Sequence, residues 1–587
     1  MASTATGTPG ATVAAAAAAA AASASPPSAP PQPQDAHDAY EQAVLALNSL
    51  QTTAAILEQV RKKGNLLNCQ SIPEMQSFLS RIGVTDADLA RLRIIHIAGT
   101  KGKGSTAAMV ERMLRACSVP TADGRRRPLR TGLFTSPHLL TVAERIRIDG
   151  APLPPSVFAQ TFWSVWHKLE QTRHATMPNP SADPALAGTP AAQMPVPAKP
   201  NYFRYLTVMA FEAFVAHGVD VAIIECGVGG TYDATNVVPQ PVVTGITSLG
   251  IDHTAVLGNT IESIAQHKAG IMKPGVPCVT TMQHAGRADA VLRAEAQRHG
   301  CADQLAVLGD AAIARLGRAV PIGLAGAHQH ANAAVALTLV QRWLERAGPA
   351  LHAHVPAALR AALGAVQWAG RAQTLRLPGW PACVFRIDGA HTPESLAACA
   401  AWFAGTQRAA APSPSPSSSL PPRRALVFTC THGRQAGTLL PALRALTFSA
   451  ADADANGDPS DGRAAATFDD VVFVTSDVYE PPASPTQAAA STKVDYQNAN
   501  VGARDAALPA QHEMAAAWRR LPAPAAAAMD AAVAVAGSVE AALARLMQGA
   551  DRRPGAPPME ILVTGSLYLV GATLTYLEEN PQAPPDR

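Results

Sequence analysis

The chain has 587 residues, too many for one ordinary hydrophobic core, so we expect two domains with irregular segments between and within them. Its net charge of +3 is spread along the sequence, and its densest basic run, Arg125–Arg127 with Arg130, is more typical of a solvated loop than of a nucleic-acid-binding surface. The eight cysteines form no C-x-x-C pair and no apolar run could span a bilayer, so we expect an intracellular protein with reduced, mostly buried thiols, no zinc site and no membrane span.

The first 36 residues are mainly Ala, Ser, Thr and Pro, and the first lysine or arginine is Arg61. Secretory signals begin with basic residues and mitochondrial presequences are rich in arginine. We therefore expect a disordered tail and a cytoplasmic protein, with a mitochondrial form from another start site as the alternative. Apolar residues then recur at helical spacing from Tyr40 to Gln51, which predicts the first helix.

A glycine-rich loop, Gly99–Ser105, lies between an apolar run, Leu92–Ala98, and a helix-competent stretch, Ser105–Cys117. Strand, glycine turn and helix form a nest of backbone N–H groups that binds phosphate. We therefore predict a nucleotide site rather than a plain surface turn; its residues are Thr100, Lys101, Gly102, Lys103, Gly104 and Ser105. The loop departs from a strict Walker A sequence because Gly104 separates the lysine from the hydroxyl residue.

Strands and helices alternate after this loop, which predicts a mostly parallel α/β sheet. In the first region we expect a helix at Phe203–His217, strands at Val219–Ile224 and Val242–Leu249, and a helix at Ile261–Ile271. A second region should contain strands at Cys383–Ile387, Arg424–Thr429, Asp470–Thr475 and Glu560–Thr564. Segments rich in Pro, Ala and Ser at 171–199, 408–422, 450–467 and 482–532 read as flexible insertions.

Polar residues follow several of these strands, at the edge where open α/β sheets bind ligands. Glu225 ends a buried strand before the glycines at 227–230, and its carboxylate suits Mg²⁺. The Ser-Pro turn at Ser136 exposes a hydroxyl. Taken alone, His253 and the helical Lys268 would more often be structural or solvated, so the residue types leave their roles open.

Several segments, in order, resemble the folylpolyglutamate synthases of the Mur ligase superfamily. They are the G-T-K-G-K-G-S loop, T-S-P-H at 135–138, E-x-G-x-G-G-x-x-D-A-T-N at 225–236, D-H-T at 252–254, K-A-G-I at 268–271, H-Q-x-x-N-A at 328–333 and D-G-A-H-T at 388–392. Thr231-Tyr232 is nearer the eukaryotic members. In W-A-G-R, Ala369 replaces the family's proline, and in the segment 431–435 Gln435 replaces its acid.

The resemblance implies two domains: a P-loop ATPase-like domain at 37–366 and a Rossmann-like α/β domain at 367–587. It also implies a role for each candidate residue. Ser136 and Glu225 would bind one Mg²⁺ and His253 a second, while Lys103, Asn332, Arg371 and Asp388 would bind ATP; Lys268 would be carbamylated, His391 would lie near the incoming glutamate, and Tyr202, Phe203 and Asp233 would contact the folate. A monovalent cation is a further cofactor of this scheme.

The implied activity is a Mg²⁺- and ATP-dependent ligase, active as a monomer, that extends tetrahydrofolate and its polyglutamates with L-glutamate through an acyl phosphate. Dihydrofolate synthase, alone or as a second activity, is the near alternative, and dihydropteroate as acceptor would distinguish it. A nucleotide-binding scaffold without catalysis is the alternative of another class. A cell-wall ligase and a GTPase-type switch fit the sequence less well.

Overall fold

The computed structural model describes residues 36–51, 71–121, 123, 125–174, 197–347, 355–409, 422–430, 436–446, 468–479, 507–522, 531–550 and 558–583. The predictions for residues 1–35, for the segment 431–435 and for most of the insertions lie outside these residues. Within the described part of the chain, no helix combines the length and apolar content needed to cross a membrane. Seven cysteines are described there; all are free and six are buried.

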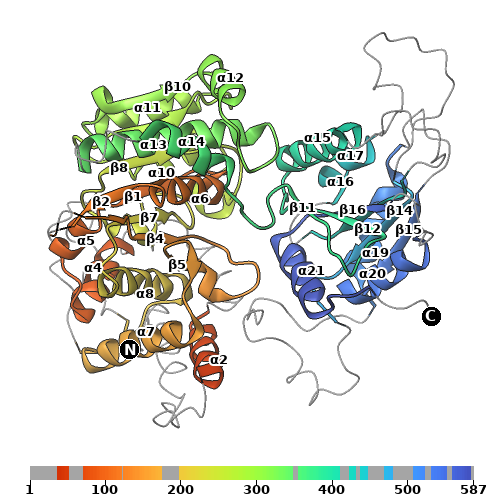
Figure 1. Ribbon diagram of the computed structural model, residues 1–587, viewed down its shortest axis with the longest axis horizontal. Helices are drawn as coiled ribbons and strands as arrows, with labels where there is room; N and C mark the ends of the chain where they lie inside the picture. The colour runs from red at the N-terminus through yellow and green to blue at the C-terminus, as the bar shows by residue number, and fades with distance from the viewer. Residues whose placement is uncertain are drawn as a thin grey trace, which may run out of the picture.

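The first half of the chain forms an eight-stranded sheet in the order β10-β9-β8-β1-β7-β4-β5-β6 (Figure 1). Its strands are β1 Ile95–Ala98, β4 Thr131–Phe134, β5 Ile146–Ile148, β6 Ala151–Pro152, β7 Val221–Glu225, β8 Val243–Ile246, β9 Cys278–Thr281 and β10 Leu305–Leu308. All pairs from β10 to β4 are parallel, and β5 and β6 continue the sheet antiparallel. The predicted mostly parallel sheet is therefore confirmed. The basic run at Arg125–Arg127 falls at a separate short hairpin, β2 Ser118–Pro120 with β3 Arg126–Pro128.

Helices cover both faces of this sheet because side chains of a strand alternate between them. Val221 and Ile223 of β7 face a core formed with α6 Lys103–Leu114, α13 His328–Ala347 and α14 Val355–Gly364. Ala222 and Ile224 face the opposite core, formed with α2, α4, α7 and α8. Besides α6, α13 and α14, the helices of the first half are α2 Ala36–Asn48, α4 Ser71–Ile82, α5 Asp86–Arg91, α7 Pro155–Gln171, α8 Tyr202–Ala216, α9 Thr254–Leu257, α10 Ile261–Ala269, α11 Ala288–Arg298 and α12 Asp310–Ala319.

The second half forms a six-stranded sheet in the order β11-β12-β16-β13-β14-β15, parallel except for β11. Its strands are β11 Gln373–Leu375, β12 Cys383–Ile387, β13 Arg424–Phe428, β14 Asp470–Val474, β15 Ala532–Ala536 and β16 Met559–Thr564. Its helices are α15 Pro393–Ala409, α16 Ala436–Leu439, α17 Pro441–Arg444, α19 Pro509–Arg520, α20 Val539–Gln548 and α21 Leu567–Glu579. Figure 1 shows α15, α16 and α17 on one side of this sheet and α20 and α21 on the other. All four predicted strands of this region are present, each within one residue of its predicted bounds.

The prediction of a flexible insertion at 482–532 is wrong for its C-terminal part. Helix α19 lies inside it, and β15, which was not predicted, begins at its last residue. The alanine-rich composition suggested low complexity, but Met514 and Trp518 recur at helical spacing and are buried. Trp518 contacts the rings of Phe468 and Phe473, so the helix covers the sheet near β14.

We expect Trp518→Ala to lower the free energy of unfolding by about 3–5 kcal/mol, because it leaves a cavity beneath α19. Urea unfolding followed by circular dichroism measures this change. Arg520→Ala, on the exposed side of the same helix, is the matched control and should change stability by less than about 0.5 kcal/mol. Equal, small effects of both substitutions would show that α19 does not dock on the sheet.

Candidate active site

A cavity of about 1120 Å³ lies at the carboxyl ends of β1, β7 and β8 and is also bordered by Arg371, which precedes β11, and by residues that follow β12. Of the predicted site residues, it is lined by Thr100, Lys101, Gly102, Lys103, Gly104, Ser105, Ser136, Phe203, Glu225, Asp233, His253, Asn332, Arg371, Asp388 and His391. Tyr202 and Lys268 are not lining residues: Tyr202 packs against Arg145, which lines the cavity, and Lys268 donates to the Gly99 carbonyl behind the loop. Segments from both sheets thus meet around one space.

The glycine loop between β1 and α6 has a conformation that larger residues cannot adopt. Gly102 has φ 88°, and a Cβ on it would lie 2.1 Å from Oδ1 of Asn332. A Cβ on Gly99 would lie 1.8 Å from Oγ1 of Thr247. Lys103 Nζ donates to the carbonyl oxygens of Gly99 at 3.0 Å and Thr100 at 3.4 Å, so its ammonium group is held inside the loop. Helix α6 begins at this lysine, two residues earlier than predicted, because Gly102 supplies the left-handed N-cap.

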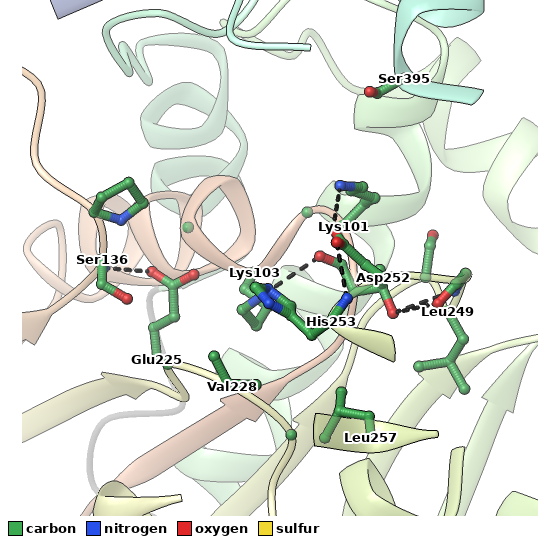
Figure 2. Close-up of a pocket in the computed structure, with 18 of the residues that line it drawn as sticks. Lys101, Lys103, Ser136, Glu225, Val228, Leu249, Asp252, His253, Leu257 and Ser395 are labelled. Carbon is green, nitrogen blue, oxygen red and sulfur yellow. Dashed lines mark hydrogen bonds and ion pairs between the residues drawn. The ribbon is translucent and has the colours of Figure 1, made fainter. Parts of the chain in front are cut away.

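The second lysine of the loop joins three segments. Lys101 Nζ lies 2.9 Å from Asp252 Oδ2 and 3.1 Å from His391 Nε2 (Figure 2 shows the Asp252 contact). Burial alone would raise the pKa of Asp252, but His391 and Lys101 hold it well below its usual range. The sequence analysis assigned no role to Asp252, although its position beside His253 at a strand end was a usable signal. This three-residue contact of Lys101, Asp252 and His391, called the joint below, connects the loop Gly99–Ser105 to the second sheet.

Glu225 is the buried carboxylate of the cavity. Its Oε2 accepts a hydrogen bond from the Ser136 backbone N–H at 3.1 Å, and the Ser136 hydroxyl lies beside it in Figure 2. Burial raises the pKa of Glu225, whereas the charges of Lys103, Arg371 and Arg145 lower it. A carboxylate and a hydroxyl are hard oxygen donors, so this pair fits a Mg²⁺ ion that takes its other ligands from phosphate and water.

His253 lies apart from this pair. Figure 2 places Lys103 between Glu225 and His253, so the three predicted metal ligands share one cavity but do not form one set. Burial and the ammonium groups of Lys103 and Lys268 lower the pKa of His253. In the described ranges, no three His, Cys, Asp or Glu side chains are grouped as a metal site.

Lys268 is buried rather than solvated, in contrast to what a helical lysine usually does. Its Nζ donates to the carbonyl of Gly99 at 2.7 Å, directly behind the glycine loop. Burial, with the nearby Lys103 charge, lowers the pKa of Lys268 to about 7. A substantial fraction of this side chain is therefore an uncharged amine at neutral pH.

Arg371 and Asp388 enter the cavity from the second sheet. Asp388 accepts hydrogen bonds from the backbone N–H groups of Ala372 at 2.7 Å and Ala390 at 2.9 Å, so it fixes the segment that carries Arg371. Burial lowers the pKa of Arg371, while the Asp388 and Glu225 carboxylates oppose that effect. The guanidinium is therefore within electrostatic reach of a carboxylate from each sheet.

The three candidate folate-binding residues differ in position. Phe203 lines the cavity and packs under Gly227, whose Cβ would lie 2.4 Å from the ring. Tyr202 instead packs against the guanidinium of Arg145, at 5.4 Å. Asp233 accepts backbone N–H bonds from Val228 at 2.9 Å and Thr235 at 3.0 Å, so its Oδ2 holds the glycine-rich loop after β7 and its Oδ1 caps the helical turn Ala234–Val237.

Arg145, which the sequence analysis did not single out, lines the cavity. Its Nε donates to His138 Nδ1 at 2.9 Å, which orients the guanidinium. Its pairing with the ring of Tyr202 could not be derived from sequence spacing, because α8 lies 57 positions further along the chain (202 minus 145). The arginine and the T-S-P-H segment are thereby parts of one wall of the cavity.

No family model matches the chain. A folylpolyglutamate synthase of Neurospora crassa is 36% identical over 544 residues, which cover 92% of this chain and 91% of that protein. The mitochondrial folylpolyglutamate synthase of Homo sapiens is 40% identical over 427 residues, 70% of this chain and 66% of that protein, so the chain spans just under two thirds of this relative.

Among solved structures, the folylpolyglutamate synthase of Mycobacterium tuberculosis complexed with ADP superposes with a TM-score of 0.60 at 25% identity, over 93% of this chain and 100% of that one. This similarity confirms the mixed α/β fold class with a mostly parallel sheet. With the identity to the fungal relative over nine tenths of both chains, it shows that the chain belongs to the folylpolyglutamate synthase family.

Proposed function

We propose that this protein is an ATP-dependent ligase that joins L-glutamate, through its amine, to the γ-carboxylate of tetrahydrofolate and tetrahydrofolyl polyglutamates. The observation that carries the proposal is the meeting of the Lys103 loop, Glu225 and Arg371 at one cavity. These are the groups that transfer of a phosphoryl group to a carboxylate requires: a phosphate nest, a metal-binding acid and a second cation. The names of the relatives supply the substrate class.

A carboxylate does not react readily with an amine, so the reaction needs activation. We propose that a γ-carboxylate oxygen of the folate attacks the γ-phosphorus of ATP, which releases ADP and forms an acyl phosphate. The glutamate amine then attacks the acyl carbon, loses a proton, and expels inorganic phosphate. Lys103 and Arg371, both at the cavity, would stabilise the negative charge that develops on the transferred phosphoryl group.

The loop Thr100–Ser105 would hold the ATP phosphates, with Asn332 and Asp388 contacting the rest of the nucleotide. Ser136 and Glu225 would hold one Mg²⁺ and His253 a second. When bound, these ions neutralise phosphate charge. ADP is bound by the M. tuberculosis relative, which supports a nucleotide at this position.

His391 would lie beside the incoming glutamate, because it closes the cavity opposite the glycine loop through Lys101. We propose the domains 37–366 and 367–587, with the Lys101, Asp252 and His391 joint at their contact. Closure there would exclude water from the acyl phosphate. The monomeric state and the cytoplasmic location remain predictions.

Purified protein incubated with ATP, tetrahydrofolate and labelled glutamate should form ADP only when all three are present, and the folate should gain one glutamate. Lys103→Ala should lower kcat/KM by about 100-fold or more, because a charge contact to phosphate is lost. Lys168→Ala is the control and should leave kcat/KM unchanged, because Lys168 of α7 pairs with Glu212 of α8 and neither residue lines the cavity. A preference for dihydropteroate would favour dihydrofolate synthase, and ATP binding without turnover would favour a scaffold.

Gly102→Ala should weaken ADP binding at least about tenfold, since its Cβ would collide with Asn332 and displace the loop. Isothermal titration calorimetry measures the affinity. Gly275→Ala is matched in backbone strain, with φ 68°, but nothing lies within 4 Å of its Cβ. Its affinity should equal that of the unaltered protein; a similar loss in both variants would show that strain, not the phosphate loop, is responsible.

We propose that the Lys268 amine adds to CO₂, forming a carbamate and releasing a proton, so that it becomes an anionic ligand near the metals. Only the neutral amine reacts, and a pKa of about 7 makes that form dominant above neutral pH. With ¹³C-bicarbonate, a carbamate carbon signal should therefore be stronger at pH 8 than at pH 6. It should vanish in Lys268→Gln and persist in Lys273→Gln, whose lysine pKa is also lowered by burial. A signal that survives Lys268→Gln would contradict the assignment.

A further inference from the structure

His96 is a buried imidazole in the middle of the first sheet that the proposed reaction does not use. It lies in β1 between β7 and β8, opposite Ile224 on one side and Thr244 on the other, and is 0% exposed. Burial lowers the pKa of His96 to about 3, so the ring is neutral. Placing a polar ring at the centre of a parallel sheet is costly unless it is hydrogen-bonded, which calls for a physical reason.

The contacts of His96 define a directed chain of hydrogen bonds. Its Nε2 lies 2.8 Å from Thr235 Oγ1, and that hydroxyl contacts Asp233 Oδ1. The backbone N–H bonds that both Asp233 oxygens accept favour the ionised carboxylate, which has no proton to donate, so the Thr235 hydroxyl donates to it. Thr235 Oγ1 must then accept from an Nε2–H on His96.

The tautomer follows from the other ring nitrogen. His96 Nδ1 is buried and has no hydrogen-bond partner among the described residues. A proton there would leave a buried donor unpaired, which costs more than leaving an acceptor unpaired. The Cys226 sulfur lies 3.1 Å from Nε2 and 3.5 Å from the Thr235 hydroxyl, but sulfur is a weak hydrogen-bond partner compared with the Thr235 oxygen.

This chain of hydrogen bonds ends at the backbone near Glu225 and Lys268. Asp233 Oδ2 accepts a hydrogen bond from the Val228 N–H, which closes the loop 227–231 that directly follows Glu225 and Cys226. The next part of that loop packs on α10: a Cβ on Gly230 would lie 2.8 Å from the carbonyl oxygen of Lys268, and Thr231 N donates to His267 O at 2.8 Å. The position of this loop therefore sets where the acid and the lysine stand relative to each other.

We propose that His96 is a positioning residue for catalysis. Through Thr235 and Asp233, its Nε2–H fixes the loop 227–231, and the position of this loop sets where Glu225 stands relative to Lys268. The kinetic part of this inference rests on the proposed ligase function, whereas the structural part does not. A merely structural histidine would tolerate any side chain of similar volume. The hydrogen-bonded series His96, Thr235, Asp233 and Val228, which we call the relay, instead requires a donor at the Nε2 position.

Glutamine and asparagine at this position separate the two ring nitrogens. The glutamine amide nitrogen reaches about as far as Nε2, whereas that of asparagine reaches only as far as Nδ1. His96→Gln should keep kcat within about threefold of the unaltered enzyme, while His96→Asn and His96→Leu should lose about tenfold or more through misplacement of the loop. The loss should fall on kcat, with the KM for ATP little changed. Thr235→Ser should likewise retain activity and Thr235→Val should lose it.

Thr244→Val is the matched control, because Thr244 is the register neighbour of His96 and its buried hydroxyl bonds the Pro277 carbonyl, at 3.2 Å, and the Cys278 thiol, neither of which belongs to the relay. It should cost stability but not kcat. A second readout does not depend on activity: amide hydrogen exchange over residues 227–231 should quicken about tenfold in His96→Leu and Thr235→Val but not in Thr244→Val.

Equal activity of the glutamine and asparagine variants at matched melting temperature, or unchanged exchange over 227–231 in His96→Leu, would overturn the relay. An unaltered protein that forms no glutamate-dependent ADP would instead reject the proposed function. In that case the exchange data alone decide the relay: faster exchange in His96→Leu and Thr235→Val supports it, and unchanged exchange overturns it.

Discussion

The parallel pairing of β1 with β7 and β8 is the constraint on which the rest of the site depends. Ile97 pairs with Glu225 on one side and with Gly245 on the other, so all three strands end at the same edge. The glycine loop, the buried acid and the segment carrying Asp252 therefore leave the sheet side by side. One residue of slip in either pairing would shift Glu225 relative to Gly104, above whose Cα its carboxylate lies.

The cavity lining holds equal numbers of cationic and anionic side chains. The cations are Lys101, Lys103, Arg145, Arg204 and Arg371, and the anions are Glu225, Asp233, Asp252, Asp388 and Glu394. Lys268 adds a further buried amine close to Lys103. Packing cations together has a cost, which Lys268 reveals: burial and the charge of Lys103 lower its pKa to about 7. A neutral Lys268 relieves the repulsion without removing the amine from the site.

Sequence reasoning found the parts of the site that depend on local chain geometry. The glycine loop is recognisable because strand, positive-φ glycine and helix follow each other directly, and Glu225 because it ends an apolar run. Contacts between distant segments were not predictable: no spacing rule pairs Lys101 with His391 or places His96 against Thr235. In the second sheet, composition misled at α19, since four buried side chains, two of them the large Met514 and Trp518, dock an alanine-rich helix.

The contact between the two halves explains why Ser136 and Arg371 can act together. Leu139, three residues after Ser136, is buried in the core of the second sheet, and a Cβ on Gly571 of α21 would lie 2.3 Å from its carbonyl oxygen. From the other side, Trp368 packs under the Arg147 guanidinium at 4.8 Å, and its Nε1 lies 3.5 Å from where a Cβ on Gly104 would stand. Each half thus inserts a side chain into the other. Because Leu139 is three residues from Ser136 and Trp368 is three residues from Arg371, we expect a displacement of the second sheet to move both site residues.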